Sequence, residues 1–153
     1  MDRDDLIKTA GNLRQVSEKS VSEYSFKRNG LVDLLNKKME SREDLPDMVG
    51  IGNIDMMKDN HANHARFLES IFIQHSPEVL VDTVLWVFRA YRSRNFRSTY
   101  WSAQLNSWIE ILEKELSKEC FSEIYPYYNW MQINIPTFNK LAEKDLEIPY
   151  SAH

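Results

Sequence analysis

The segment from Ser76 to Leu116 constrains the fold most, because it predicts two long amphipathic helices joined by a short link. Its opening Ser-Pro-Glu places a capping side chain directly before a proline, and proline is favoured at the first position of a helix. This helix is expected to reach about Ser93, and Ser98 is placed to cap the next one. Apolar residues then recur at helical spacing and predict one buried face: Trp101, Leu105, Trp108, Ile109, Leu112 and Leu116.

The first third of the chain predicts two further helices and a connector. Asp2 is placed to cap the first helix, and the Asn29-Gly30 pair is expected to break or bend the chain. A second helix is expected from Leu31 to about Glu40. The following residues, 41–53, contain one proline and two glycines, so they are expected to form a connector with at most one helical turn.

A third long helix is predicted between that connector and Ser76. Asn53 is placed to cap it, and it is expected to run from Ile54 to about Gln74. Residues spaced by three and four along it predict one inward-facing stripe: Ile54, Met57, His61, His64, Leu68 and Ile71.

The C-terminal part predicts one last long helix, from Ser117 to about Lys144. Pro126 and Pro136 fall inside it, so a kink or a break is expected there. The residues from about 145 to 153 are expected to form a loosely held tail. With only four glycines and five prolines, the chain does not fit an all-β fold. Residues 1–153 are therefore expected to form one all-α domain of six or seven helices.

Composition narrows the class of protein. The net charge is −4, and the one cluster of basic residues is Arg89, Arg92, Arg94 and Arg97, too small a set to predict nucleic-acid binding. Cys120 is the sole cysteine, which excludes an intrachain disulfide and a thiolate metal cluster. No apolar run approaches the length of a membrane span, and the N-terminus is too acidic for a secretory signal. A cytoplasmic location is expected.

Two histidines share one face of the predicted helix 54–74. His61 and His64 are three residues apart and lie on its apolar stripe. They can be a polar pair aimed into a pocket, as metal ligands or as donors to an anionic head group, or they can be core-edge histidines bonded to their neighbours. A metal site would need more ligands than this pair offers, because zinc usually takes three or four. No metal is expected.

The end of the helix that begins at Ser76 is rich in arginine and aromatic residues. Arg89 and Arg92 suit the negative end of a helix dipole, and either guanidinium is also suited to neutralise a carboxylate. Trp86, Phe88, Trp101 and Trp108 can form a cofactor box or plain core. A second aromatic cluster is too dense to be wholly buried and predicts a homodimer interface on the last helices: Tyr125, Tyr127, Tyr128 and Trp130.

Signals of catalysis are weak in the sequence. The chain has no glycine-rich phosphate loop, no nucleophile elbow and no HExxH zinc motif. Cys120 has no histidine close to it in sequence, and a lone thiol of this kind is usually structural. The protein is not expected to be an enzyme.

The block WVFRAYRSRNFRSTYWSAQLNSWIEIL resembles the end of the F helix and the G helix of a globin. On that pattern Tyr91 falls at the haem-binding histidine, Phe96 falls at the apolar anchor of the link, and His61 or His64 falls on the E helix facing the cavity. The last helix takes the place of the globin H helix. Neutral imidazole is the ordinary axial ligand of a globin haem, so the resemblance with tyrosine at this position implies that haem is not the cofactor.

The blocks HANHARF and WVFRAY are similar to the non-haem globin-like sensor domain found at the front of some sporulation sensor histidine kinases of bacilli, and in small free-standing homologues. That resemblance implies a dimeric globin-like fold with an apolar tunnel suited to a fatty acid. It also implies a signalling function, in which a stand-alone copy inhibits sporulation by competing for the kinase's signal or by pairing with its sensor domain.

These observations predict a small-molecule-binding sensor domain for a fatty-acid-like ligand. The head group is expected to be fixed by His61, His64, Arg89 or Tyr91. The walls of the tunnel are expected to be Met57, Leu68, Val84, Phe88, Leu105 and Trp108. The alternatives are a haem or tetrapyrrole sensor that uses Tyr91 or His64 as a ligand, and a helical interaction module without any ligand.

Overall fold

The computed structural model describes residues 1–145 and contains only helices within that range. Eight helices follow one another in this part of the chain: α1 (Arg3–Ala10), α2 (Glu18–Glu40), α3 (Leu45–Val49), α4 (Ile54–Ile73), α5 (Pro77–Arg92), α6 (Ser98–Glu115), α7 (Lys118–Ile133) and α8 (Ile135–Asp145). The all-α prediction is confirmed. The predicted tail lies, from residue 146 onward, outside the described residues.

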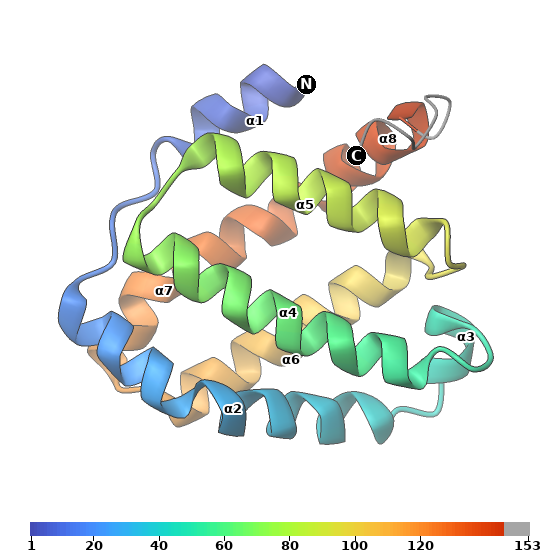
Figure 1. Ribbon diagram of the computed structural model, residues 1–153, viewed down its shortest axis with the longest axis horizontal. Coiled ribbons are helices and arrows are strands. Elements are labelled where there is room, and N and C mark those ends of the chain that lie inside the picture. The colour runs from blue at the N-terminus through green and yellow to red at the C-terminus, as the bar shows by residue number, and fades with distance from the viewer. Residues whose placement is uncertain (146–153) are drawn as a thin grey trace.

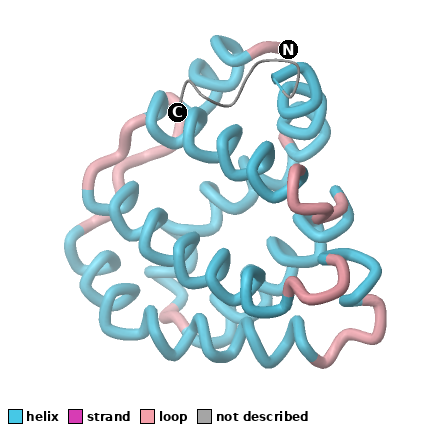
Figure 2. Tube along the Cα trace, turned by 45° about the vertical axis from the view of Figure 1, so that its right-hand side comes forward, coloured by secondary structure: helices cyan, strands magenta, loops and turns pink. Residues whose placement is uncertain are grey.

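The helices form a layered arrangement around α4 and α5 (Figure 1). Helices α4 and α5 run side by side in the front layer, with α6 and α7 behind them. Helix α2 packs against both α4 and α6, while α1 and α8 pack against α5. The loops lie at the edges of the molecule (Figure 2). Helices α4 and α5 make little direct contact with each other, because the side chains between them do not fill the whole space.

Serine caps begin three of the helices, as their sequence positions favour. The hydroxyls of Ser17, Ser76 and Ser117 each accept a hydrogen bond from the backbone N–H three residues later. Asp2 forms a capping box with Asp5 at the start of α1. Arg97, and not Ser98, precedes α6, and its side chain makes no capping hydrogen bond. The boundaries of α4 and α5 otherwise fall within one residue of the prediction.

The predicted break at Asn29-Gly30 is wrong, because α2 runs through it without interruption. Tyr24 and Leu31 are both buried on its inner face, so packing against α4 and α6 continues across the glycine. A glycine inside a helix costs about 1 kcal/mol relative to alanine, and this packing offsets it. The chain breaks earlier, at Gly11, where α1 ends.

The two prolines of the last predicted helix have different outcomes. Pro126 lies inside α7, whereas α7 ends at Ile133, with Asn134 as its C-cap, and α8 begins at Ile135. Pro136 is therefore in the first turn of α8, where a missing N–H removes no hydrogen bond within the helix. The predicted break is confirmed near Pro136, and it raises the number of described helices above the six or seven expected.

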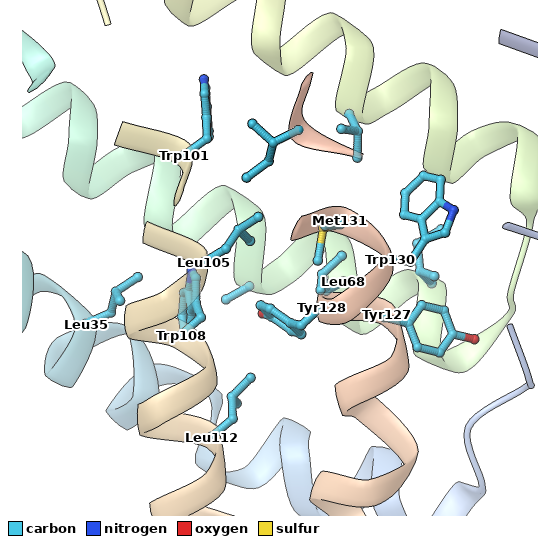
Figure 3. Close-up of a cluster of buried hydrophobic side chains, with 14 of the residues drawn as sticks. Leu35, Leu68, Trp101, Leu105, Trp108, Leu112, Tyr127, Tyr128, Trp130 and Met131 are labelled. Carbon is cyan, nitrogen blue, oxygen red and sulfur yellow. The ribbon is translucent and has the colours of Figure 1, made fainter. Parts of the chain in front are cut away.

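Most of the second aromatic cluster lies in the core and not at an interface. Tyr127, Tyr128 and Trp130 are buried, and Tyr125 is 39% exposed. Figure 3 shows Leu105 and Trp108 projecting from α6 toward Tyr128 of α7. The density of aromatic residues is accommodated because α7 contacts three neighbours, α2, α6 and α8.

Two glutamates cap the opposite helix in a reciprocal arrangement at the crossing of α2 and α7. Glu23 of α2 accepts hydrogen bonds from the backbone N–H and the hydroxyl of Ser117, both at 2.7 Å. Glu123 of α7 accepts the equivalent pair from Ser17, at 2.8 and 2.9 Å, and also accepts from the hydroxyl of Ser20. The same Ser-to-Glu spacing thus occurs at the start of α2 and at the start of α7. Each glutamate accepts hydrogen bonds from the serine that caps the other helix.

Acid is expected to remove the stabilisation that Glu23 and Glu123 supply. The hydrogen bonds from Ser117 hold the pKa of Glu23 below its ordinary value of 4.5, and those from Ser20 and Ser17 do the same for Glu123. Below that ordinary value the unfolded chain binds protons that the folded chain does not. This stabilisation is therefore complete above about pH 4.5 and is lost as the pH falls through the folded-state pKa values.

A Glu123→Gln variant should show the effect in urea unfolding measured across this range. It should lose about 1 kcal/mol near neutral pH, the difference between hydrogen bonds to an ionised and to a neutral acceptor, and its stability should fall less steeply in acid. Glu119→Gln, at an exposed position of the same helix, is the matched control and should change stability by less than about 0.5 kcal/mol. If the stability of the wild type and of Glu123→Gln decreased equally steeply with falling pH, this assignment would be contradicted.

Candidate ligand cavity

An inner cavity of about 220 Å³ lies between α4 and α5. Helix α6 supplies a third wall, and α7 and α8 contribute one residue each. Its lining residues are Asn60, Asn63, His64, Phe67, Leu68, Thr83, Val84, Trp86, Val87, Phe88, Tyr91, Trp101, Gln104, Leu105, Met131 and Phe138. We refer to this space as the inner cavity. Trp86, which is 42% exposed, stands at its solvent side.

The lining is mostly apolar and carries a short polar edge without formal charge. Aliphatic and aromatic side chains make most of the wall, and the polar groups are amides, a hydroxyl, a phenol and one imidazole. No aspartate, glutamate, lysine or arginine is among the lining residues. Such a cavity favours an apolar ligand with few hydrogen-bonding groups, since an unpaired charge placed there would lose its hydration without compensation.

His64 is held at the cavity wall in its neutral form. Its Nε2 lies 2.8 Å from the hydroxyl of Tyr128, and its ring stacks on that of Trp108 with centroids 5.3 Å apart. Burial lowers the pKa of His64 to about 3. The imidazole therefore acts as an uncharged hydrogen-bonding group and supplies no positive charge to the cavity.

A buried hydrogen-bond network begins at Asn60 and leads behind the cavity wall. The side-chain oxygen of Asn60 accepts hydrogen bonds from Tyr100, at 2.8 Å, and from Gln104, at 2.7 Å. The Tyr100 hydroxyl also lies 3.0 Å from Nε2 of His61, whose Nδ1 is 2.6 Å from the side-chain oxygen of Asn36. The network joins α4 to α6 on one side and to α2 on the other.

Tyr91 lies at the cavity as a neutral phenol. Burial raises its pKa, and a hydrogen bond with Asn60 opposes that rise. Its ring meets those of Phe96 and Trp101 edge to face, with centroids 5.0 and 5.8 Å apart. An iron-bound tyrosinate requires the opposite shift, so this environment does not prepare Tyr91 for the position of an axial ligand.

The structure brings six of the ten predicted site residues together at the cavity: His64, Leu68, Val84, Phe88, Tyr91 and Leu105. The other four do not line it, and the prediction is corrected there. Met57 and His61 are buried on the adjacent face of α4, which packs against α2. Trp108 lies one turn beyond Leu105, behind the ring of His64.

Arg89 is the fourth residue outside the cavity. It follows Phe88, and successive residues of a helix point about 100° apart, so Arg89 occupies a different face of α5. There it lies beside a separate surface hollow that Asp82, Thr83 and Trp86 also line. The predicted contact between Arg89 and a ligand head group inside the cavity is therefore not supported by the geometry.

Four residues of the predicted inner stripe of α4 are buried, but only His64 and Leu68 of that stripe line the cavity. The residues of α4 that line the cavity are Asn60, Asn63, His64, Phe67 and Leu68, which recur at helical spacing. Asn60 and Gln104 interrupt apolar stripes and were a usable signal of a polar edge. Met131 and Phe138 gave none, since only the tertiary packing brings them here.

Residues 1–145 bring no set of metal-ligating side chains together. No three histidine, cysteine, aspartate or glutamate side chains of that range are grouped so that they could hold a metal ion. Cys120 is buried, and burial raises the pKa of its thiol to about 11, which keeps it protonated near neutral pH. None of the described helices is long and apolar enough to cross a membrane.

Comparisons with known proteins found no match to this chain among protein-family models, curated proteins or solved structures.

His61 and His64 are expected not to titrate in the folded protein between about pH 8 and pH 5, because desolvation lowers the pKa of each to about 3. Their imidazole proton shifts, followed by NMR, should stay constant over that range and titrate near the ordinary 6.5 when the chain is unfolded in urea. The unfolded chain then binds protons that the folded chain does not, so stability should fall as the pH drops below about 6.5. A folded-state midpoint above about pH 5 for either ring would contradict this.

Proposed function

We propose that the protein is a sensor domain with a globin-like fold, which binds a fatty-acid-like small molecule in the inner cavity and performs no catalysis. The observation that carries this proposal is the apolar cavity between α4 and α5, with its uncharged polar edge. A protein interior is normally packed without voids much larger than a water molecule. A cavity of this size, lined by aromatic side chains, is the default position for a ligand.

Support for a globin-like arrangement comes from the helices around the cavity. In the resemblance, α4 and α5 take the places of the globin E and F helices, and the cavity lies between them, where a globin holds its cofactor. The short link from Arg92 to Ser98 then leads into α6 as the G helix. Helices α7 and α8 together take the place of the H helix, divided at Asn134.

The size and chemistry of the cavity suit a small apolar molecule or part of an acyl chain. Its volume of about 220 Å³ exceeds the roughly 150 Å³ of engineered apolar cavities that admit benzene. Each buried methylene contributes roughly 0.8 kcal/mol, so a short alkyl segment offsets part of the cost of ordering the ligand. Asn60, His64, Tyr91 and Gln104 offer hydrogen bonds to one neutral polar group.

The signalling part of the proposal rests on the resemblance of HANHARF and WVFRAY to sensor domains of sporulation kinases. A free-standing chain in the cytoplasm would inhibit sporulation by competing for the signal of a sensor histidine kinase or by pairing with its sensor domain. Ligand binding would bias that pairing only if the two states bind the ligand with different affinity. A homodimer would use the exposed side of α7, which carries Tyr125 and Ile133.

A haem or tetrapyrrole sensor is the second candidate, favoured by one observation: His64 and Tyr91 line the same cavity from facing helices. Its physical difficulty is that the nitrogen of His64 already contacts Tyr128 and the pKa of Tyr91 is raised. A helical interaction module without a ligand is the third candidate.

Organic extraction of the purified protein, with mass spectrometry of the extract, separates these candidates. The proposal expects one class of amphiphilic molecule in a near-stoichiometric amount. Protein produced with added haem should show no Soret band, and such a band would favour the second candidate instead. The proposal would be refuted if native mass spectrometry and organic extraction both found no small molecule and if the protein did not bind added fatty carboxylates.

A Val84→Phe variant should lose the ligand without losing the fold. Val84 is 8% exposed and lines the cavity, so a larger side chain fills existing space and buries more apolar surface. We expect the extracted ligand to fall at least about tenfold, equivalent to about 1.4 kcal/mol, and the Tm to stay equal or rise. Val79→Phe adds the same ring at a 50% exposed position of the same helix and should retain the ligand. Equal ligand content in both variants would contradict a site in this cavity.

A further inference from the structure

Two hollows meet at one pair of aromatic rings. The first is the inner cavity, and the second is a cleft of about 930 Å³ at the corner between α5 and α6. We call the second space the outer cleft. It is lined by Pro46, Asp47, Gly50, Ile51, Phe88, Arg92, Asn95, Phe96, Arg97, Ser98, Thr99, Trp101, Asn139 and Glu143. Phe88 and Trp101 are the two residues that line both spaces.

Phe88 and Trp101 therefore form a partition between the inner cavity and the outer cleft. Their rings are stacked, with centroids 4.5 Å apart and planes 19° from parallel, and each residue is only 5% exposed. Phe138 packs edge to face on Phe88, and Tyr91 does so on Trp101. No hydrogen bond holds the stack together, so only packing opposes a change of side-chain rotamer.

The rim of the outer cleft is tied more firmly than the partition. The Asn53 side chain donates to the carbonyls of Val49, at 2.7 Å, and Arg94, at 3.0 Å, and the Arg97 N–H donates to Met48 at 2.8 Å. Gly50 has a φ of +88°, and a Cβ there would lie 3.2 Å from the Asn53 amide. These bonds fix the link between α5 and α6 to the segment before α4.

Charge distinguishes the two spaces. The inner cavity is lined by no formal charge, and its one imidazole, that of His64, is neutral. The outer cleft is lined by two arginines, Arg92 and Arg97, and by two carboxylates, Asp47 and Glu143. Arg92 already pairs with Glu143 at 2.8 Å, whereas the exposed guanidinium of Arg97 has no ion-pair or hydrogen-bond partner among the described residues. An anionic head group can thus pair with Arg97 in the cleft, whereas no cation lines the cavity.

The geometry points to a ligand that spans both spaces: we propose that the ring pair of Phe88 and Trp101 opens to admit a single-chain anionic amphiphile. The far end of the alkyl chain then lies in the inner cavity, the part next to the head group passes between the two rings, and the carboxylate lies in the outer cleft beside Arg97. This inference rests on the proposed function and adds to it the direction of binding and the residue that selects the head group. It also accounts for a long chain, which needs more room than the inner cavity alone provides.

The partition is tested by the rate at which hexadecanoate associates, measured by stopped-flow tryptophan fluorescence. Trp101→Ala removes half of the partition and should raise the association rate about tenfold or more. Ile109→Ala, from the same helix, changes a residue that lines neither the inner cavity nor the outer cleft and should leave the rate within about twofold. Should Trp101→Ala fail to fold, judged by circular dichroism, Trp101→Phe retains a ring and should give a smaller acceleration.

The head-group position is tested by comparing hexadecanoate with hexadecanol in calorimetric titrations. Arg97→Gln should weaken hexadecanoate about tenfold and leave hexadecanol within about twofold. Arg94→Gln is the matched control, since Arg94 lies in the same link but does not line the outer cleft. Equal effects of the two arginine variants, or unchanged rates in both Trp101 variants, would overturn this inference while the cavity remains a binding site. A wild-type protein that binds neither amphiphile would refute the proposed function itself, and this inference with it.

Discussion

The two hydrogen bonds that Asn60 accepts from Tyr100 and Gln104 are the constraint on which the cavity depends. They join α4 to α6 through side chains at a point where the two helices are too far apart for close backbone packing. Buried polar groups are costly unless they are paired, so this network resists a collapse that would separate its members. Because these hydrogen bonds hold α4 in place against α6, α4 does not close onto α5, and the space between α4 and α5 remains only partly filled.

The electrostatic character of the cavity follows from the same burial. His61 and His64 lie in or behind the wall, and desolvation keeps both rings neutral. Burial likewise raises the pKa of Tyr91 and so favours its neutral phenol. The cavity thus combines hydrogen-bonding capacity with an absence of charge, while the arginines of the α5–α6 corner lie on the other side of an aromatic stack. This separation of polar and charged groups suits an amphiphile better than a metal complex.

The reciprocal caps show how a local signal becomes tertiary structure. Ser117 was predicted from the sequence as the start of a helix and Ser17 was not, although a glutamate follows each serine at the same spacing. The sequence does not reveal that Glu23 serves Ser117 and Glu123 serves Ser17. That exchange requires α2 and α7 to cross near their first turns, and it fixes the end of the molecule opposite the α5–α6 corner.

Local chemistry determined most of the helix boundaries and the all-α class, because caps, prolines and apolar spacing act within a few residues. It also identified His64, Phe88 and Tyr91 at the cavity. Only the tertiary structure decided that α2 continues through Gly30, that His61 faces α2, and that Arg89 lies outside the cavity. A helix presents several faces, and the neighbour that covers each face depends on residues far away in the chain. Phe138 and Met131 complete the wall for the same reason, and no local pattern in the sequence carries that information.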